Sequence, residues 1–222
     1  MSKITLFHDV ISPYSWVGFE RITRYAHNSF KNTTLDIQPV FLSGIMQGSG
    51  NKPPGIVPAK MKFMGNDLRF INKFDAIPVN PIQNAPNKLF RKGSKEAQRF
   101  LTAMKLDGKD IEETARQFSI KMWSVDEDIT DKNVLIEAAI RSGLSADQAD
   151  NYMAKIDDAE VKSELMKVTK KALDLGCFGC PSFLVENAEG SKHFTFGSDR
   201  IELICQLTGE EYKGSLPQFS KC

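Results

Sequence analysis

"KITLFHDVISPYSWVGFERITRYAHNSF", residues 3–30, is the stretch that decides the fold. Its first part, residues 3–11, is rich in β-branched and aromatic side chains and predicts a strand. A helix should follow at once, because Ser12 is a good N-cap and Pro13 suits the first helical position, where its missing N–H costs nothing. Apolar residues then recur at helical spacing. The chain therefore opens with a strand that leads directly into a helix.

A second strand is predicted over residues 34–43, "TLDIQPVFLS", and Pro39 places it toward the edge of its sheet. The strand–helix–strand crossover should be right-handed and parallel. From Gly44 the composition changes, and "GIMQGSGNKPPG" predicts a loop rich in glycine and proline.

A long helical region follows this loop. Ser145 with Gln148 forms a capping box at the start of one helix. The segment 76–88, "AIPVNPIQNAPNK", has too much proline for regular structure and predicts an ordered surface loop. Apolar residues recur at helical spacing in six segments: 58–74, 94–106, 109–123, 131–142, 145–156 and 158–175.

The C-terminal part returns to strands. "PSFLVE" (181–186) and "KHFTFG" (192–197) predict an antiparallel hairpin around the turn "NAEG". "SDRIELICQLTG" predicts a final helix, with Ser198 as its N-cap and Asp199 as its first residue. The order is thus βαβ, a helical block, then ββα.

A strand is not stable alone, so the two ends of the chain should share one sheet. The fold class is therefore α/β: a thioredoxin-like domain with a mixed four-stranded sheet, interrupted by a large all-helical insertion. We expect residues 1–46 and 174–222 to form the discontinuous thioredoxin-like domain and residues 47–173 to form the inserted helical domain.

Composition is that of an ordinary globular protein, with 41% hydrophobic residues, 26% charged residues and a formal net charge of +1. There is no basic stripe with interleaved aromatics, so we expect no nucleic-acid partner. No apolar run approaches the ~20 residues of a membrane helix. The start, "MSKITLFHDV", lacks the regions of a signal peptide, and we expect an intracellular protein.

Four cysteines are present, at positions 177, 180, 205 and 222, and their positions frame no secreted disulfide scaffold. Cys177 and Cys180 have the C-x-x-C spacing of a redox pair or of half a metal site, but they are also consistent with incidental thiols. No second ligand pair accompanies them, so we expect no zinc or other metal.

In a thioredoxin-like fold, chemistry occurs where the first strand meets the first helix, because the helix N-terminus favours a thiolate there. Here that turn reads Ser12-Pro13-Tyr14-Ser15, and serine cannot form a disulfide. Its hydroxyl can still donate a hydrogen bond to a thiolate that arrives with a ligand, and a free thiol, with a pKa of about 8.5, gains from such a bond. Ser12 is therefore either a plain helix cap or a thiolate-stabilising hydroxyl.

A family resemblance favours the second interpretation. The chain resembles a kappa-class glutathione S-transferase, of the family that also holds the bacterial 2-hydroxychromene-2-carboxylate isomerases and the DsbA oxidoreductases. The resemblance covers nearly the whole chain, and it is carried by five stretches that occur in order: "FHDVISPYSWVGFE", "SGIMQGSGNKPPG", "DEDIT", "GCFGCPSF" and "FGSDRIELI".

The resemblance implies a homodimer that uses glutathione as a co-substrate, with no permanently bound cofactor. Ser12 would stabilise the glutathione thiolate, and Pro13 and Tyr14 would line the turn. Pro181 falls at the position of the cis-proline that thioredoxin-like folds set opposite this turn. The backbone of Cys180, before it, would then contact the cysteinyl unit of glutathione.

The two ends of glutathione are assigned in the same way. Asn51 would hold the glycyl end, assisted by Lys60, which otherwise is a solvated surface lysine. Ser198 and Asp199 would hold the γ-glutamyl end, because N–H and hydroxyl groups bind its carboxylate and the Asp carboxylate pairs with its ammonium group. Asp67 also resembles a family position, and it would reach glutathione or the dimer partner unless it is simply solvated.

Two aromatic positions keep alternative interpretations. His8, close to Ser12 in the sequence, either tunes the thiolate electrostatically or replaces one packed ring with another. Trp16 belongs either to the core or to the wall of a substrate pocket.

The resemblance implies attack of the glutathione thiolate on a small electrophile, at carbon or at a hydroperoxide oxygen. Three alternatives remain: a glutathione-dependent isomerase of the 2-hydroxychromene-2-carboxylate type, a thioredoxin-like binding module without redox activity, and a dithiol oxidoreductase using Cys177 and Cys180. The ending Ser220-Lys221-Cys222 matches the peroxisomal signal S-K-L in two positions and favours a peroxisome, with the mitochondrion next and the cytosol left open.

Overall fold

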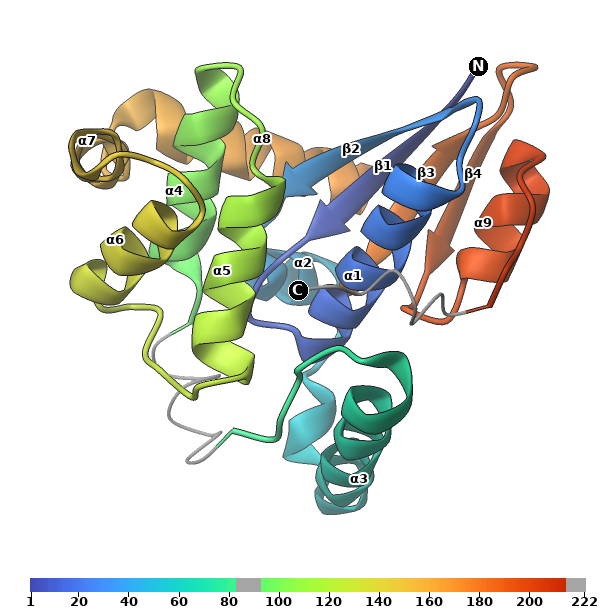
Figure 1. Ribbon diagram of the computed structural model, residues 1–222, viewed down its shortest axis with the longest axis horizontal. Coiled ribbons are helices and arrows are strands. Elements are labelled where there is room, and N and C mark those ends of the chain that lie inside the picture. Colours follow the sequence, from blue (N-terminus) through green and yellow to red (C-terminus); the bar gives the residue numbers. More distant parts are fainter. Residues whose placement is uncertain (83–92, 215–222) are drawn as a thin grey trace.

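The fold is described by a computed structural model that places residues 1–82 and 93–214 (Figure 1). Four strands form one mixed sheet in the order β2-β1-β3-β4. β1 pairs in parallel with β2 and antiparallel with β3, and β3 pairs antiparallel with β4. Both ends of the chain therefore contribute to one sheet, as the sequence predicts. The strands are β1 (Ser2–His8), β2 (Thr33–Pro39), β3 (Ser182–Glu186) and β4 (Lys192–Phe196).

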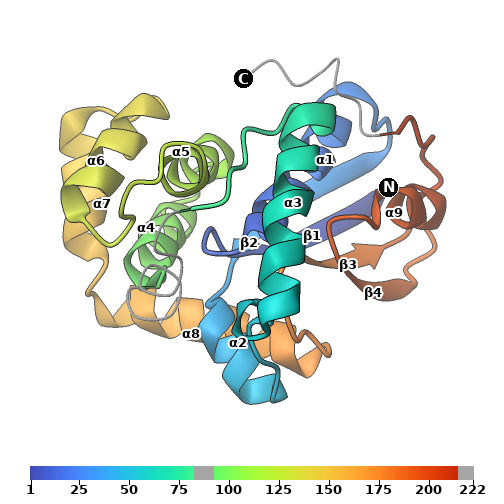
Figure 2. The same ribbon diagram turned by 90° about the horizontal axis from the view of Figure 1, so that it is seen from below.

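Helices cover both faces of this sheet. α1 (Pro13–Asn28) lies on one face, α8 (Ala159–Asp174) crosses the opposite face, and α9 (Ile201–Thr208) packs against β3 (Figures 1 and 2). β2 is an edge strand, and Pro39 is its last paired residue, opposite His8. Pro39 is thus placed at the edge, where a residue without an N–H is tolerated.

The predicted helical region consists of six helices in the described residues. α4 to α7 gather beside the sheet, α8 runs from this group across one face of the sheet, and α3 lies apart from them (Figures 1 and 2). The capping box at Ser145 is present in full. The predicted loop 76–88 lies outside the described residues from position 83 onward. Besides α8, the helices are α3 (Pro58–Asp75), α4 (Lys95–Leu106), α5 (Glu112–Trp123), α6 (Lys132–Arg141) and α7 (Ala146–Lys155). The predicted division of the chain into a thioredoxin-like domain (residues 1–46 and 174–222) and an inserted helical domain (residues 47–173) stays a prediction.

The glycine-rich segment after β2 differs from its prediction as a loop. It forms helix α2 (Leu42–Ser49), and a short 3-10 turn, η1 (Pro54–Ile56), comes after it. The N–H of Leu42 is capped by the Asp9 carboxylate at 2.8 Å, a partner 33 residues away that a local pattern does not reveal. Gly48 also has a role within the helix, because a Cβ there would lie 2.7 Å from Leu173 of α8. These tertiary contacts stabilise a helix that its glycines alone disfavour.

The last helix begins later than predicted. α9 starts at Ile201 with Arg200 at its N-cap, so Ser198 is not a cap and Asp199 is not the first helical residue. Both residues instead lie in the tight connection that follows β4. The backbone at Gly197, with φ of +115°, turns the chain directly before Ser198.

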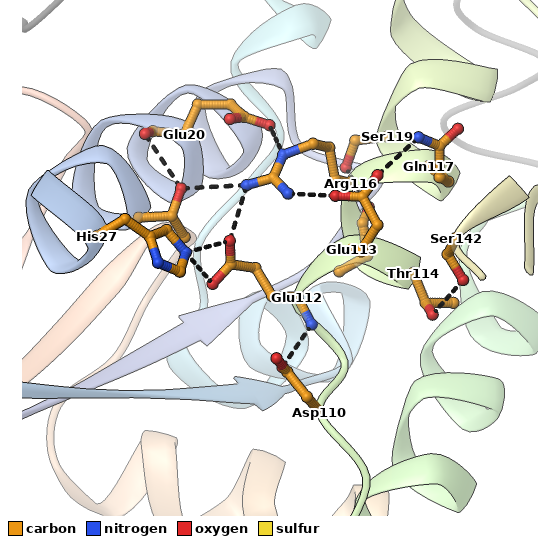
Figure 3. A network of polar contacts seen from close by, with 12 residues as sticks. Glu20, His27, Asp110, Glu112, Glu113, Thr114, Arg116, Gln117, Ser119 and Ser142 are labelled. Atoms are coloured by element: carbon orange, nitrogen blue, oxygen red, sulfur yellow. Dashed lines mark hydrogen bonds and ion pairs between the residues drawn. The ribbon is translucent and has the colours of Figure 1, made fainter. Parts of the chain in front are cut away.

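A polar network joins α1 to α5 (Figure 3). The Arg116 guanidinium donates to the carboxylates of Glu20 (2.9 Å), Glu112 (3.0 Å) and Glu113 (2.5 Å). Glu112 also contacts His27 Nε2 at 2.8 Å. The side chain of Glu20 is only 4% exposed, so a buried ion pair ties the first helix of the chain to the helical region.

Within residues 1–82 and 93–214, no helix has both the length and the apolar character needed to cross a membrane.

Candidate active site

The turn between β1 and α1 places Ser12 at the start of a 16-residue helix. Its backbone is extended (φ −95°, ψ 119°), its Oγ accepts the Ser15 N–H at 3.1 Å, and Pro13 follows as the first helical residue. The predicted N-cap and helix start are therefore present. Capping leaves the Ser12 hydroxyl hydrogen free to donate, and it donates to the carbonyl oxygen of Cys180 at 3.1 Å.

The loop before β3 forms the opposite wall of this turn. The Cys180–Pro181 peptide bond is cis, and the Pro181 carbonyl accepts the Gly197 N–H at 3.0 Å. α1 approaches this wall closely through Gly18, where a Cβ would lie 2.6 Å from Pro181 Cγ and 3.4 Å from the Ser198 Cα. The fold thus brings Ser12, Pro13, Cys180, Pro181 and Ser198 together from three distant parts of the chain.

Asp9 is a site residue that the sequence analysis missed. It is fully buried directly after β1, and its carboxylate accepts hydrogen bonds from Ile11 N (3.0 Å), Leu42 N (2.8 Å) and Ser94 Oγ (3.0 Å). Burial raises its pKa to about 6, against the lowering effect of these donors. Asp9 therefore fixes the turn to α2 and to the residue before α4; an acidic residue directly after a buried strand is the signal that could have found it.

His8 is a packed ring. Its side chain is fully buried, Nδ1 lies 2.8 Å from Ser15 Oγ, and the ring centroid lies 5.0 Å from that of Phe19. Burial lowers its pKa to about 3, so the imidazole is neutral at physiological pH. A neutral ring offers no positive charge to a thiolate, which supports the packing interpretation over electrostatic tuning.

Tyr14 connects the turn to α3. Its hydroxyl donates to Asp67 Oδ2 at 2.7 Å, and its pKa is raised by burial and by the Asp67 carboxylate. Asp67, expected to reach glutathione or a partner, is thus placed against Tyr14. Trp16 is fully buried and donates through Nε1 to Glu20 at 3.0 Å, so it lies in the core and not in a pocket wall.

An apolar cavity of about 190 Å³ opens beside Ser12. The turn, α2, the η1 loop and α3 all contribute to it, and three methionine side chains are in its lining. Such a cavity suits a small apolar ligand next to the Ser12 hydroxyl. Its lining residues are Ile11, Ser12, Pro13, Tyr14, Leu42, Ser43, Met46, Pro53, Pro54, Gly55, Met61 and Met64.

The residues assigned to the glycyl end lie at the rim. Asn51 is exposed, and its Nδ2 donates to the Phe178 carbonyl at 2.7 Å, which links the loop after α2 to the Cys180–Pro181 wall. Lys60 is exposed in the first turn of α3.

The residues assigned to the γ-glutamyl end border a separate hollow of about 160 Å³. Ser198 and Asp199 line it together with Arg21, whose Nη1 donates to the Ser198 carbonyl at 2.9 Å. Arg21 also pairs with Asp75 at the end of α3. Arg21 was not predicted, because a helical arginine carries no local signal of its partner.

The C-x-x-C cysteines are close to the site but are not at the α1 turn. Cys177 and Cys180 are both buried free thiols, 1% and 5% exposed. In the part of the chain that the structure describes, no group of three or more His, Cys, Asp or Glu side chains could hold a metal ion.

The fold and the turn define a thioredoxin-fold protein that has serine at the start of its first helix. A family model described as DSBA-like thioredoxin domain matches residues 3–207. The chain is 40% identical to human "Glutathione S-transferase kappa 1" and 37% identical to that of Rattus norvegicus, each over 96% of this chain and 94% of the relative. The chain therefore belongs to the kappa-class glutathione S-transferases, within the DsbA-like thioredoxin family.

Solved structures show the same fold at low sequence identity. A 2-hydroxychromene-2-carboxylate isomerase aligns with a TM-score of 0.71 at 14% identity, over 92% of this chain and 93% of that one. The cytosolic disulfide reductase DsbM from Pseudomonas aeruginosa, solved with GSH, aligns with a TM-score of 0.57 at 16% identity, over 87% of this chain and 89% of that one.

Proposed function

We propose that this protein is a glutathione transferase that joins the glutathione thiolate to small electrophiles, with glutathione as co-substrate and no resident cofactor. The observation that carries the proposal is the Ser12 hydroxyl: it caps α1 through its oxygen, points its hydrogen at the Cys180 carbonyl 3.1 Å away, and borders an apolar cavity. Membership of the kappa class supports the same activity.

The hydroxyl must change partner for this role. A bound thiolate offers a charged acceptor, and a hydrogen bond to a charged group is about twice as strong as a neutral one, so the hydroxyl turns from the Cys180 carbonyl to the sulfur. Such a bond contributes ~1.5–3 kcal/mol, and the N-terminus of α1 adds ~0.3–1 kcal/mol. At about 1.4 kcal/mol per unit, the pKa of the glutathione thiol falls by roughly one to three units. Most of the bound thiol is then ionised at neutral pH.

The rest of glutathione spans the floor of the site. The cysteinyl unit pairs with the backbone of Cys180. The γ-glutamyl end enters the hollow beside Ser198 and Asp199, while Asn51 and Lys60 hold the glycyl end. The close packing of Gly18 on Pro181 supports this arrangement, because it holds the two halves of the binding surface together.

The electrophile occupies the apolar cavity next to the sulfur. A carbon–sulfur bond forms as the electron pair of the thiolate attacks, and the displaced group leaves with the bonding pair. With a hydroperoxide, the thiolate attacks the outer oxygen, an alkoxide leaves, and a second glutathione converts the sulfenic acid to glutathione disulfide and water. The methionines at positions 46, 61 and 64 offer a soft, adaptable wall that suits varied small substrates.

Replacing Ser12 tests the proposal. Ser12→Ala should fold normally and lose conjugation of a halogenated nitrobenzene, with kcat/KM reduced about 10- to 100-fold by the loss of one charge-assisted hydrogen bond. Ser163→Ala, at an exposed serine of α8, is the matched control. An unchanged kcat/KM in Ser12→Ala would remove Ser12 from the mechanism. Isomerisation of a hydroxychromene carboxylate without conjugation would assign the isomerase activity instead, and absence of glutathione binding in calorimetry would leave a binding module.

We also propose that two copies associate through α3. Phe63, Phe70 and Phe74 are 60–65% exposed and fall on one face of that helix, at spacings of seven and four residues. Three exposed phenylalanines on one stripe are unusual for a monomer surface. Light scattering should give a dimer for the native chain and a monomer for Phe70→Glu; a monomeric native chain at micromolar concentration would contradict the assignment.

Peroxisomal delivery through the terminal Ser-Lys-Cys is a further part of the proposal, and those residues lie outside the described part of the chain. A fluorescent protein fused to the N-terminus should reach peroxisomes, and deleting the last three residues should abolish this. Mitochondrial or cytosolic fluorescence that is the same with and without the last three residues would contradict peroxisomal delivery.

A further inference from the structure

The proposed transferase reaction leaves the thiol pair of the loop before β3 unused. Cys177 and Cys180 are both buried, and Cys177 Sγ lies 3.2 Å from the Gly179 carbonyl oxygen and 3.3 Å from Ser182 Oγ. The Ser182 hydroxyl in turn donates to the Gly179 carbonyl at 2.7 Å. The Cys180 thiol is hydrogen-bonded to that of Cys177, so the two thiols lie side by side in one short turn.

This turn is also the wall that faces Ser12. The Cys180 carbonyl oxygen lies 3.1 Å from Ser12 Oγ, and the Cys180 sulfur is only three bonds from that carbonyl carbon. A sulfur atom that replaces the Cys180 carbonyl as the partner of Ser12 therefore arrives next to the Cys180 side chain. The side chains of Cys177 and Cys180 are hydrogen-bonded to each other, and a ligand sulfur held by Ser12 would be the third sulfur atom in this row.

We propose that Cys177 and Cys180 form a second reactive centre, which exchanges its two thiols for a disulfide with glutathione disulfide bound at the same site. The inference rests on the proposed function, because it uses the glutathione site beside Ser12. It adds a dithiol–disulfide exchange activity to that site, on the wall opposite the α1 turn where the serine excludes such chemistry.

The exchange proceeds in two balanced steps. Cys180 passes its proton to the Cys177 thiolate and attacks one sulfur of glutathione disulfide; a Cys180–glutathione disulfide forms and one glutathione leaves as thiolate. That thiolate takes the proton from Cys177, which then attacks the Cys180 sulfur and expels the second glutathione. Two electrons pass from the protein dithiol to glutathione disulfide, and two molecules of reduced glutathione leave. Two reduced glutathione molecules reverse the sequence.

The environments of the two thiols suit these roles. The pKa of Cys177 is lowered to about 7. The neighbouring Cys180 thiol lowers it most, the Ser182 hydroxyl and the Gly179 backbone lower it further, and burial acts in the opposite direction. The pKa of Cys180 is raised, first by Cys177 and then by burial and by the Asp9 carboxylate. Cys177 is therefore the thiol that is ionised near neutral pH, which makes it the resolving nucleophile and, in the reverse direction, the better leaving group.

Peptide mass spectrometry of the full chain tests the inference. Cys222→Ser protein, which lacks the terminal thiol, is reduced and then equilibrated in glutathione buffers with an increasing fraction of glutathione disulfide. It is quenched in acid and digested. We expect a Cys177–Cys180 disulfide to accumulate in this protein. Cys177→Ser should instead accumulate glutathione on Cys180, because nothing resolves the mixed disulfide, and Cys180→Ser should show neither product. Cys205, fully buried in α9, should stay a free thiol throughout and is the internal control.

The inference is overturned if the folded Cys222→Ser protein keeps Cys177 and Cys180 free in the most oxidising buffer, a result that does not depend on how the Cys177 and Cys180 variants fold. It is also overturned if Cys177→Ser carries no glutathione on Cys180. Calorimetry with reduced glutathione separates the two proposals: no binding defeats the proposed function itself, whereas normal binding with unreacted thiols defeats only the dithiol centre.

Discussion

Arg116 carries the ion pair that joins α1 to the helical region, and its replacement by methionine should be strongly destabilising. Its guanidinium lies 2.9 Å from a carboxylate oxygen of Glu20, whose side chain is 4% exposed (Figure 3). The guanidinium carbon also lies 5.2 Å from the centroid of the Phe19 ring. Burial alone would lower the pKa of Arg116, but the surrounding glutamates raise it. Methionine has a similar length and leaves little cavity, so the main consequence is an unpaired buried carboxylate.

The magnitude follows from the exposure of each partner. Removing one partner of a buried pair costs ~3–5 kcal/mol, and the Trp16 Nε1 donor that remains on Glu20 moderates this cost. The bonds to Glu112 and Glu113 join residues four and three positions apart on one helix and add ~0.3–0.5 kcal/mol each. We therefore expect Arg116→Met to lower the free energy of unfolding by about 3–4 kcal/mol, a large part of the ~5–15 kcal/mol of an ordinary protein.

Urea unfolding followed by tryptophan fluorescence measures this change. Arg141→Met is the matched control, because Arg141 pairs with Glu137 on the surface and its side chain is 64% exposed; we expect a change of at most ~0.5 kcal/mol. The free energy of unfolding of the double variant, Arg116→Met with Glu20→Gln, should return to within about 2 kcal/mol of the native value, because no buried charge remains unpaired. If Arg116→Met loses less than ~1 kcal/mol of unfolding free energy, or if the double variant regains none of it, an unpaired Glu20 charge is not the cause of the destabilisation.

Two further substitutions probe the walls of the site. Gly18→Ala places a Cβ 2.6 Å from the Pro181 ring, which cannot move aside, so we expect a loss of about 1–3 kcal/mol in urea unfolding and a higher KM for glutathione. Gly65→Ala in α3 is the control, because nothing lies within 4 Å of the added Cβ, and this change should be neutral or stabilising. Equal unfolding free energies for the two variants would contradict the close packing of Gly18 on Pro181. Asp9, with its pKa raised from 3.8 to about 6, favours the folded state when protonated. Its contribution is complete below about pH 4 and is lost as the pH rises through 6, a change of ~3 kcal/mol at about 1.4 kcal/mol per unit. Asp9→Asn should remove this component from the pH dependence of unfolding, and identical slopes for both proteins between these pH values would show that Asp9 does not titrate there.

The sequence predicted the elements whose signals are local. The strand before Ser12, the cap at Ser12 and the capping box at Ser145 each depend on residues a few positions apart, and the structure contains all three. The shared sheet followed from a general rule, that strands at both ends of the chain need partners. These features together place the candidate site at the turn between β1 and α1, and its role stays a prediction.

The errors arose where a distant partner decides the conformation. α2 was predicted as a loop because its glycines disfavour a helix, yet Asp9 caps it from another segment and Gly48 lets it pack on Leu173. The start of α9 was placed two residues early, because Ser198 is a residue type that often caps helices, whereas here it lies in the turn after Gly197. Arg21 was missed for the same reason, since a helical arginine does not signal its tertiary partner, whereas the position of Asp9 directly after a buried strand was a signal that went unused.

The same dependence on distant contacts explains why one serine can be both cap and candidate catalytic group. The oxygen of Ser12 is fixed by the Ser15 N–H within its own helix, while its hydrogen is directed by Cys180, which is 168 positions away. A thiolate competes only for the hydrogen, so the helix keeps its cap while the hydroxyl changes partner. Binding of the ligand therefore requires rotation of the Ser12 hydroxyl about its Cβ–Oγ bond and no unwinding of α1. In the proposed function the site is therefore organised before glutathione binds, and the stability of α1 and the ionisation of the bound thiol are separable properties of the same residue.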